Sequence, residues 1–208
     1  MTATSPEPRL VILAAGASTR LGQPKALVPI DGQNALQRYC AVARELLNEG
    51  PIVVTGAHHA EIAAQAPAGA QLVHNALWQD GRTGSLQCAW RAAPGRDLLV
   101  APADVPRVPI DVFALLLAAW HAAANPAMGW LAPFWAGPDP TSGYGHPVCI
   151  GRSLAAQLED FSSDTPLRAL RTAARPLWQV AVRHPEILED LDTPADLDAL
   201  SKPPPEAL

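Results

Sequence analysis

The chain has 208 residues, of which 49% are hydrophobic and 17% charged, and its net charge at pH 7 is −5. That length suits one domain with a full core, and the negative balance argues against a broad surface for nucleic acid or for an anionic membrane. The three cysteines (Cys40, Cys88 and Cys149) contain no CxxC pair, so they predict neither a disulfide framework nor a zinc site but a reducing, cytoplasmic setting.

The two ends of the chain are poor in residues that can build a core. Residues 1–8 (MTATSPEP) lack the basic and apolar regions of a signal peptide, and residues 202–208 (KPPPEAL) are rich in proline. We predict that both ends are flexible and that residues 9–201 form a single domain. The longest apolar run, residues 112–124, is interrupted by His121 and is too short to cross a bilayer.

Apolar runs alternate with helical stretches through the first half of the chain. We predict strands over residues 9–15, 51–56, 70–75 and 97–104, and helices over residues 34–47, 58–66, 83–93 and 110–124. Strands that are apolar almost throughout are typical of parallel sheets covered by helices on both faces. The sequence therefore predicts an α/β fold of the Rossmann-like, three-layer α/β/α kind, with a mostly parallel, mixed central sheet.

The second half is less regular. We predict strands over residues 129–137, 145–150, 176–182 and 186–192, and helices over residues 152–160, 163–174 and 193–200. Thr165 and Thr193 each precede a proline, which predicts that each caps a helix whose first residue is that proline.

The stretch LAAGASTRLGQPK, residues 13–25, follows the first predicted strand. Ligands in sheets of this kind bind beyond the carboxyl ends of the strands, and small residues let backbone N–H groups approach a phosphate. Arg20 and Lys25 bring two positive charges, and the stretch contains no acid. The pattern predicts a loop that binds a polyphosphate.

Two common phosphate loops are excluded by spacing. A P-loop needs G-x4-G-K-[ST], whereas Gly16 and Gly22 are six residues apart and Lys25 is followed by Ala26. A dinucleotide fingerprint needs G-x-G-x-x-G, and Gly16 is followed by Ala and Ser, which disfavours a Rossmann oxidoreductase. A plain strand-to-helix turn with two solvated cations remains open at this point.

The longer stretch LAAGASTRLGQPKALVPIDG resembles the signature L-A-A-G-x-S-x-R-[ML]-G-x-x-K of the MobA-like nucleotidyltransferases. That family includes molybdenum-cofactor guanylyl- and cytidylyltransferases. The resemblance implies a nucleotidyltransferase fold in which this loop wraps the triphosphate of an NTP. It implies nucleotide-binding roles for Leu13, Ala14, Ala15, Gly16 and Ser18, and both phosphate-binding and catalytic roles for Arg20 and Lys25.

A second segment, HNALWQDGRTGSLQCAW, resembles the family's N-x-x-W-x-x-G-x-x-x-S-L stretch. The resemblance implies that Asn75, Gly84 and Ser85 help to hold the base and ribose. From residue type alone, Asn75 could equally satisfy a turn and Ser85 could cap a helix.

Two acidic motifs complete the resemblance. Asp104 ends the apolar strand LLVAPADVP, where the family's A-D-x-P carries an Mg2+ ligand, although an exposed acid before a proline turn is the alternative. LEDLDTPADL resembles the closing motif D-[IVL]-D-T-P-x-D-L, which implies that Asp192 is a second ligand, with Asp190 as the spare candidate. In a strand, these two aspartates would share a face.

GHP at residues 145–147 also matches the family. His146 is expected either to contact the acceptor phosphate or to brace its loop, and the remaining five histidines, which lack metal-ligand spacing, are interpreted as structural or solvated. The chain departs from the Gly-Asp-x-Gly-Ala-Arg pattern of the molybdenum cytidylyltransferases. Only Asp164 and Arg168 are available to replace it, which weakens a molybdopterin assignment.

The resemblance implies a Mg2+-dependent nucleotidyltransferase that moves NMP from an NTP to a phosphorylated small-molecule acceptor and releases pyrophosphate. CTP or GTP is the expected NTP. The activity most resembles that of molybdenum cofactor cytidylyltransferase. A sugar-phosphate or other phosphate acceptor is one alternative, and a non-catalytic nucleotide-binding or chaperone module is another. No nucleic acid or membrane partner is expected. The acceptor, the base preference, the oligomeric state and any protein partner are left open.

Overall fold

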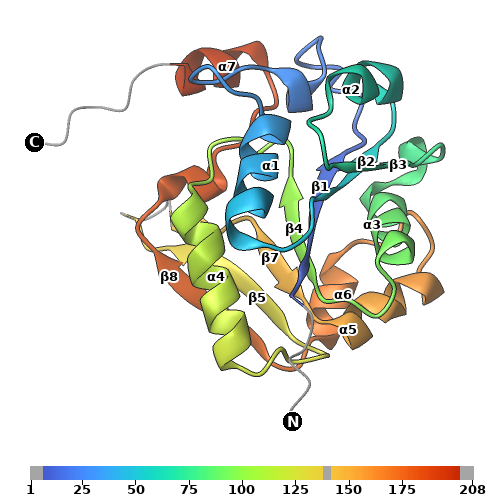
Figure 1. The fold of residues 1–208 in the computed structure, drawn as a ribbon, viewed down its shortest axis with the longest axis vertical. Coiled ribbons are helices and arrows are strands. Elements are labelled where there is room, and N and C mark those ends of the chain that lie inside the picture. Colours follow the sequence, from blue (N-terminus) through green and yellow to red (C-terminus); the bar gives the residue numbers. More distant parts are fainter. Residues whose placement is uncertain (1–6, 138–141, 202–208) are drawn as a thin grey trace, which may run out of the picture.

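The computed structural model describes residues 7–137 and 142–201 (Figure 1). Its strands form one mixed sheet in the order β3–β2–β1–β4–β7–β5, with β6 and β8 both paired with β5. The strands are β1 (Arg9–Ala14), β2 (Ile52–Thr55), β3 (Gln71–His74), β4 (Leu98–Pro102), β5 (Trp130–Trp135), β6 (Gly143–Tyr144), β7 (Val148–Ile150) and β8 (Leu177–Val182).

The predicted parallel core of the sheet is confirmed. β1 lies between β2 and β4 and runs parallel to both, and β3 continues the parallel run beyond β2. β7 runs antiparallel to β4 and to β5, β6 is antiparallel to β5, and β8 is parallel to β5. The short β6 was not predicted, because two residues are too few to show an alternation of apolar and polar side chains.

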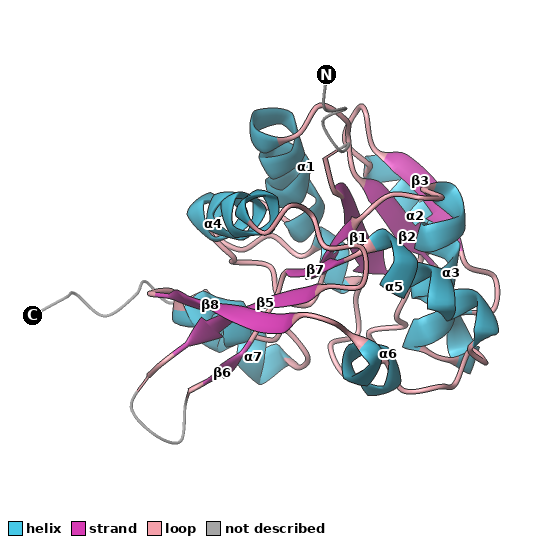
Figure 2. Cartoon of the chain, turned by 90° about the horizontal axis from the view of Figure 1, so that it is seen from below, coloured by secondary structure: helices cyan, strands magenta, loops and turns pink. Residues whose placement is uncertain are grey.

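Helices cover both faces of the sheet, which confirms the three-layer α/β/α arrangement (Figures 1 and 2). On one face, Leu10 and Ile12 of β1 pack with α1 and α4, while on the other Val11 of β1 packs with α3, α5 and α6. The α-helices are α1 (Ala35–Leu46), α2 (His59–Gln65), α3 (Arg82–Ala92), α4 (Ile110–Ala122), α5 (Arg152–Ala156), α6 (Arg168–Ala173) and α7 (Pro194–Leu200). Alternate residues of one strand thus feed two separate cores.

A third, smaller apolar cluster joins two distant parts of the chain. It is formed by Leu21, Val28, Ile30, Leu191 and Leu200, with Leu197 packed against it. The stretch after the glycine loop is thereby packed against the closing helix α7. We call it the closing cluster.

Helix starts were predicted with mixed success. The Thr193 side chain accepts a hydrogen bond from the N–H of Asp196 at 3.2 Å, and the Asp196 carboxylate accepts the N–H of Thr193 at 2.7 Å, so the predicted cap of α7 is confirmed. The start predicted at Thr165 is wrong, because α6 begins at Arg168. The Thr165 carbonyl instead accepts a hydrogen bond from Thr83 Oγ1 at 2.5 Å, which holds the segment in a turn.

The strand predicted over residues 186–192 is also wrong. A 3-10 helix, Pro185–Leu188, comes first, and the chain then runs on outside the sheet. Ile187 is buried in one of the main cores and Leu191 in the closing cluster. Since the two apolar side chains serve different cores, their spacing does not reflect a strand. The helix predicted over residues 152–160 is divided in a similar way, into α5 and a 3-10 helix, Gln157–Asp160.

The predicted flexible ends fall mostly on residues 1–6 and 202–208, which lie outside the described residues. Glu7 is the exception. Its carboxylate accepts hydrogen bonds from the backbone and side-chain N–H groups of Asn48, both at 3.0 Å, and its carbonyl accepts one from Arg96. The anchored chain therefore begins before β1. Within the described ranges, no helix is long and apolar enough to cross a membrane.

Asp97, just before β4, ties three elements together. Its side chain is 2% exposed and accepts hydrogen bonds from Trp120 Nε1 of α4 at 3.0 Å and from the backbone N–H of Arg152 at 2.8 Å. Arg152 Nη1 lies 3.3 Å from the same carboxylate. A buried carboxylate with several donors is a cross-link between the sheet, α4 and α5.

Replacing Asp97 with Ala leaves the Trp120 and Arg152 donors without their acceptor. We expect the free energy of unfolding of Asp97→Ala to fall by about 2–4 kcal/mol, because each orphaned buried donor has a cost. Urea denaturation followed by circular dichroism measures it. Asp111→Ala, which removes an exposed carboxylate facing His184, is the control and should change stability by less than about 1 kcal/mol. Equal effects of the two substitutions would contradict this role for Asp97.

Candidate active site

The parallel register places the functional loops side by side. Leu13 of β1 lies opposite Pro102 of β4, and the N–H of Ala103 donates to the Leu13 carbonyl at 3.0 Å. The N–H of Ala57, after β2, donates to the Ala15 carbonyl at 3.1 Å. Three strand ends therefore meet at one edge of the sheet, as parallel topology requires.

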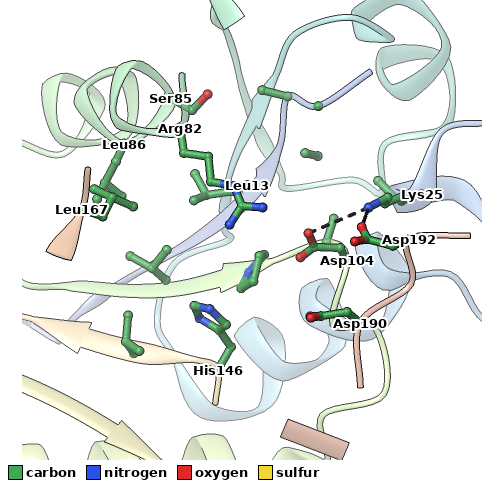
Figure 3. A pocket seen from close by; sticks show the side chains of 18 of the residues that line it. Leu13, Lys25, Arg82, Ser85, Leu86, Asp104, His146, Leu167, Asp190 and Asp192 are labelled. Atoms are coloured by element: carbon green, nitrogen blue, oxygen red, sulfur yellow. Dashed lines mark hydrogen bonds and ion pairs between the residues drawn. The ribbon is translucent and has the colours of Figure 1, made fainter. Parts of the chain in front are cut away.

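A cavity of about 670 Å³ lies at this edge (Figure 3). Most residues predicted for the site line it: Leu13, Ala14, Ala15, Gly16, Ser18, Arg20, Lys25, Ser85, Asp104, His146, Asp190 and Asp192. The tertiary structure thus brings together residues from the first strand and from the closing segment, more than 160 positions apart in the chain.

The glycine loop is fixed by its own backbone. Ser18 has φ 51°, and its carbonyl accepts the N–H groups of Leu21 at 3.1 Å and Gly22 at 2.9 Å. Its hydroxyl accepts the backbone N–H of Lys25 at 3.3 Å. Gly22 has φ 79°, a conformation that favours glycine. This short turn directs Arg20 and Lys25 to the same end of the cavity.

Asp192 is the partner of both predicted phosphate-binding cations. Arg20 Nη2 lies 2.6 Å from Asp192 Oδ2, and Lys25 Nζ hydrogen-bonds Asp192 Oδ1. Lys25 Nζ also lies 4.0 Å from Asp104 (Figure 3). The hydrogen bond from Lys25, with that from Arg20, lowers the pKa of Asp192, so the carboxylate is ionised at neutral pH.

Backbone contacts hold the two aspartates close. The N–H of Leu191 donates to the Asp104 carbonyl at 2.7 Å, and the buried hydroxyl of Tyr39, from α1, donates to the Val105 carbonyl. Asp104 and Asp192 are each about a quarter to a third exposed. Both carboxylates can therefore be reached from the cavity while their backbones are fixed.

The donor set suits a hard divalent cation. Carboxylate oxygens are the ligands that Mg2+ prefers, and it commonly takes one or two of them together with substrate phosphates. Asp190 lines the same part of the cavity, where burial raises its pKa and the charges of Asp104 and Asp192 raise it further. Among the described side chains, no three His, Cys, Asp or Glu residues are arranged to hold a metal by themselves, so phosphate oxygens would have to complete the shell.

Asn75 and Gly84 lie behind the cavity wall and do not line it. Asn75 is 5% exposed, accepts the N–H of Leu77 at 3.1 Å and donates to Ser85 Oγ at 3.1 Å. Ser85 lies inside α3, whose N-cap is Gly81, so the capping alternative for Ser85 is wrong. The turn interpretation of Asn75 is confirmed, and its side chain reaches the cavity only through Ser85.

His146 lines the cavity on the β6–β7 side (Figure 3). Its backbone N–H donates to the Ile187 carbonyl at 3.2 Å. Its Nδ1 is buried and has no partner among the described residues. Burial lowers the pKa of His146 against the opposing charge of Asp104, so the neutral imidazole is favoured. A neutral ring with an unpartnered nitrogen can still exchange a hydrogen bond with a ligand.

The comparison with known families decides the assignment. A family model described as the MobA-like NTP transferase domain matches residues 10–180. The chain belongs to the MobA-like NTP transferase family. The sequence-based assignment is therefore confirmed over most of the chain.

Two curated relatives of the family carry molybdenum-cofactor names. The molybdenum cofactor guanylyltransferase of Xanthomonas euvesicatoria pv. vesicatoria is 34% identical over 110 residues, which cover 52% of each protein, so the match spans about half of that relative's length. The molybdenum cofactor cytidylyltransferase of Escherichia coli is 26% identical over 191 residues, which cover 89% of this chain and 91% of that protein.

A solved structure supports the fold. Rv0371c from Mycobacterium tuberculosis superposes with a TM-score of 0.75 at 24% identity, covering 94% of this chain and 98% of that one. The same protein was also solved in complex with manganese, and that structure superposes with a TM-score of 0.70. At this identity the likeness shows that the two proteins share a fold.

Several cavity residues of this family member were not predicted as site residues. They are His58, Arg82, Tyr144 and Arg171, whereas Arg168 was predicted only as a possible replacement for part of the missing cytidylyltransferase pattern. Arg82, the first residue of α3, extends into the cavity between Leu13 and His146 (Figure 3). A cation at a helix N-terminus is disfavoured by the helix dipole. The position of Arg82 at the start of a predicted helix could therefore have indicated a role other than stabilising that helix. The others carried no such signal, because their segments reach the cavity only in the folded chain.

His58, interpreted as structural from the sequence, braces the glycine loop. Its Nε2 lies 2.9 Å from the Ala17 carbonyl and its Nδ1 lies 3.0 Å from the Glu61 carboxylate. Since both partners can only accept, both ring nitrogens carry a proton in the fully bonded state. The bond to Ala17, with a smaller contribution from Glu61, raises the pKa of His58 above its usual value.

This bracing predicts a pH-dependent stability. A raised pKa means that the folded chain holds the His58 proton more tightly, so the stabilisation is complete below about pH 6.5 and is lost as the pH rises through the folded-state value. The loss in unfolding free energy caused by His58→Gln should be on the order of 1 kcal/mol at about pH 5.5 and smaller at about pH 8.5. Denaturation at both pH values tests it, with His121→Gln, on the exposed face of α4, as control. A pH-independent loss would contradict it.

Proposed function

We propose that the protein transfers NMP from an NTP to a phosphorylated small-molecule acceptor and releases pyrophosphate. The observation that carries the proposal is the convergence of Lys25, Arg20, Asp104 and Asp192 at one end of a cavity bounded by the glycine loop. Two cations and two carboxylates at a loop of small residues fit a triphosphate with a divalent cation.

In the proposed reaction, a phosphate oxygen of the acceptor attacks the α-phosphorus of the NTP. The bond between that phosphorus and the oxygen bridging to the β-phosphate breaks, and pyrophosphate leaves. A phosphate acceptor is already largely dianionic at pH 7, with a second pKa of about 6, so no general base is required. Positioning and charge stabilisation then provide the catalysis.

The chain's own residues have distinct tasks in this scheme. Lys25 and Arg20, now on Asp192, would turn to the phosphates and stabilise the negative charge that develops on pyrophosphate. The backbone of Ala14, Ala15 and Gly16 borders the nucleotide, and Ser18 holds the Lys25 backbone in place. His146 faces the acceptor as a neutral hydrogen-bonding group.

The proposal includes Mg2+ held by Asp104 and Asp192, with Asp190 nearby. When bound, it would polarise the α-phosphate as a Lewis acid. The manganese complex of the mycobacterial protein supports this, since manganese shares the preference for oxygen ligands.

Among acceptors, we propose one like that of a molybdenum cofactor cytidylyltransferase, on the strength of the relative that matches nearly full length. Of the two residues that could replace the missing Gly-Asp-x-Gly-Ala-Arg pattern, Arg168 lines the cavity and Asp164 does not. Arg168 alone could therefore contact the acceptor. CTP is the expected donor and GTP the second choice.

Single substitutions test the roles of the charged end. Lys25→Ala and Asp104→Ala should each lower kcat about 100-fold or more, because each removes a group that stabilises charge in the transition state. Both variants should keep wild-type circular dichroism and unfolding temperature. Asp198→Ala, on the exposed side of α7 away from the cavity, is the control and should retain the wild-type rate. A wild-type rate of turnover by Asp104→Ala would contradict the proposal that Asp104 is a metal ligand.

The activity itself is tested by pyrophosphate release from ATP, CTP, GTP and UTP with Mg2+. Each nucleotide is combined with molybdopterin and with several sugar 1-phosphates. We expect release with CTP and molybdopterin. Pyrophosphate release with a sugar phosphate alone would identify a sugar phosphate, and not molybdopterin, as the acceptor. Nucleotide binding without any pyrophosphate release across the panel would favour a binding module.

A further inference from the structure

A second group of cations lines the cavity on the side of α6. Arg168 and Arg171 are both cavity residues, and their spacing of three places them on the same face of the helix. Leu167, the residue before them, lies on the side of the cavity away from Lys25 and Asp192 (Figure 3). These arginines are therefore separate from the phosphate-binding end formed by the glycine loop.

Neither arginine has a counter-charge from the protein within residues 7–137 and 142–201. Elsewhere in the same ranges, some arginines lie beside carboxylates, as with Arg9 and Glu49 at 2.7 Å, and others, such as Arg91 and Arg183, are exposed to solvent without an ion pair. Arg168 is exposed and Arg171 is half-buried. What distinguishes these two is that both line the cavity and yet make no side-chain hydrogen bond or ion pair within the described ranges. Guanidinium groups stay charged at all physiological pH values, so an anionic ligand is the natural partner.

Arg171 is held ready for such a ligand. Its guanidinium carbon lies 4.9 Å from the centre of the Tyr144 ring. Contact with the ring face restricts the guanidinium, while its N–H groups remain free at the edge of the plane for an anion. Tyr144 is 51% exposed and lines the cavity itself, so the pair lies where a ligand can enter.

The position of Tyr144 assigns this anion site to the acceptor. Tyr144 lies in β6, two residues before His146, and Leu167 and Leu188 add apolar surface to the same cavity. The triphosphate of an NTP is already matched by the glycine loop, Arg20 and Lys25. The remaining anionic substrate in the proposed reaction is the acceptor.

We propose that Arg168 and Arg171 bind the phosphate group of the acceptor, with Tyr144 orienting Arg171. This inference rests on the proposed function and identifies the acceptor subsite within it. Two arginines can form paired hydrogen bonds to a phosphomonoester dianion. Arg168 and Arg171 would thus set acceptor affinity, whereas Tyr144 is a positioning residue that acts through Arg171.

The test separates phosphate binding at this subsite from nucleotide binding. The protein is first saturated with the α,β-methylene analogue of whichever NTP binds by calorimetry, which fills the glycine loop and cannot react. Inorganic phosphate is then titrated as the probe. We expect Arg171→Ala to weaken phosphate binding about tenfold and Arg168→Ala/Arg171→Ala more, since hydrogen bonds to charged groups are strong. Affinity for the nucleotide analogue should stay within about twofold, since a twofold change is less than 0.5 kcal/mol.

Two further variants make the test specific. Tyr144→Phe keeps the aromatic ring and should bind phosphate as the wild type does, whereas Tyr144→Ala should weaken binding. Arg91→Ala, on α3 but outside the cavity lining, removes the same charge from the protein and should leave phosphate binding unchanged.

The inference is overturned if the nucleotide-loaded wild type binds no phosphate, or if Arg171→Ala binds it as tightly as the wild type. A failure of the proposed function looks different, because it appears as an absence of pyrophosphate release in the substrate panel, which the phosphate titration does not measure. If no NTP binds at all, the analogue-loaded form cannot be prepared. In that event, inorganic phosphate is titrated into Lys25→Ala and into the double variant Lys25→Ala/Arg171→Ala. This comparison tests the arginine site without a bound nucleotide. Loss of binding on adding Arg171→Ala would support the site, and no loss would reject it.

Discussion

The parallel pairing of β1 with β4 is the constraint on which the site depends. Leu13 lies opposite Pro102, and the hydrogen bond from Ala103 to the Leu13 carbonyl extends the ladder beyond the strands. The glycine loop and Asp104 therefore leave the sheet together. A shift of one residue would turn Val11 and Ile12 to the wrong cores. The same packing that stabilises the fold thus fixes the position of the glycine loop relative to Asp104.

The closing segment is attached to this edge by two independent means. The closing cluster buries Leu21 and Val28 against Leu191, and the N–H of Leu191 donates to the Asp104 carbonyl. Asp192 follows directly and reaches Lys25 and Arg20. Apolar burial brings the segments together, and the backbone hydrogen bond then sets their position.

Charge in the cavity is arranged unevenly. At the glycine-loop end, Arg20 and Lys25 are paired with Asp192, and Lys25 also lies 4.0 Å from Asp104. The α6 side has arginines whose described surroundings offer an aromatic ring but no acid. The proposed reaction joins two anionic substrates. It would need this division, because both substrates would have to be held while the charge that develops between them is neutralised.

The sequence by itself determined those helices and strands in which the spacing of apolar side chains matches a single helical or strand periodicity. The alternation of apolar strands and helices gave the three-layer α/β/α fold, and the motifs around Gly16, Asp104 and Asp192 identified the family, which the match to residues 10–180 confirmed. Thr193 was also predictable, because a cap depends on its immediate neighbours. These features are local or carried by contiguous motifs.

Only the tertiary structure decided the remainder. The segment at residues 186–192 looked like a strand, but Ile187 and Leu191 serve two different cores. Ser85, a plausible cap from its type, became an interior residue of α3 bonded to Asn75. His58 and Arg171 matter through Ala17 and Tyr144, which are 41 and 27 positions away in the printed sequence. Such contacts follow from how the layers pack, and no local pattern of residues encodes them.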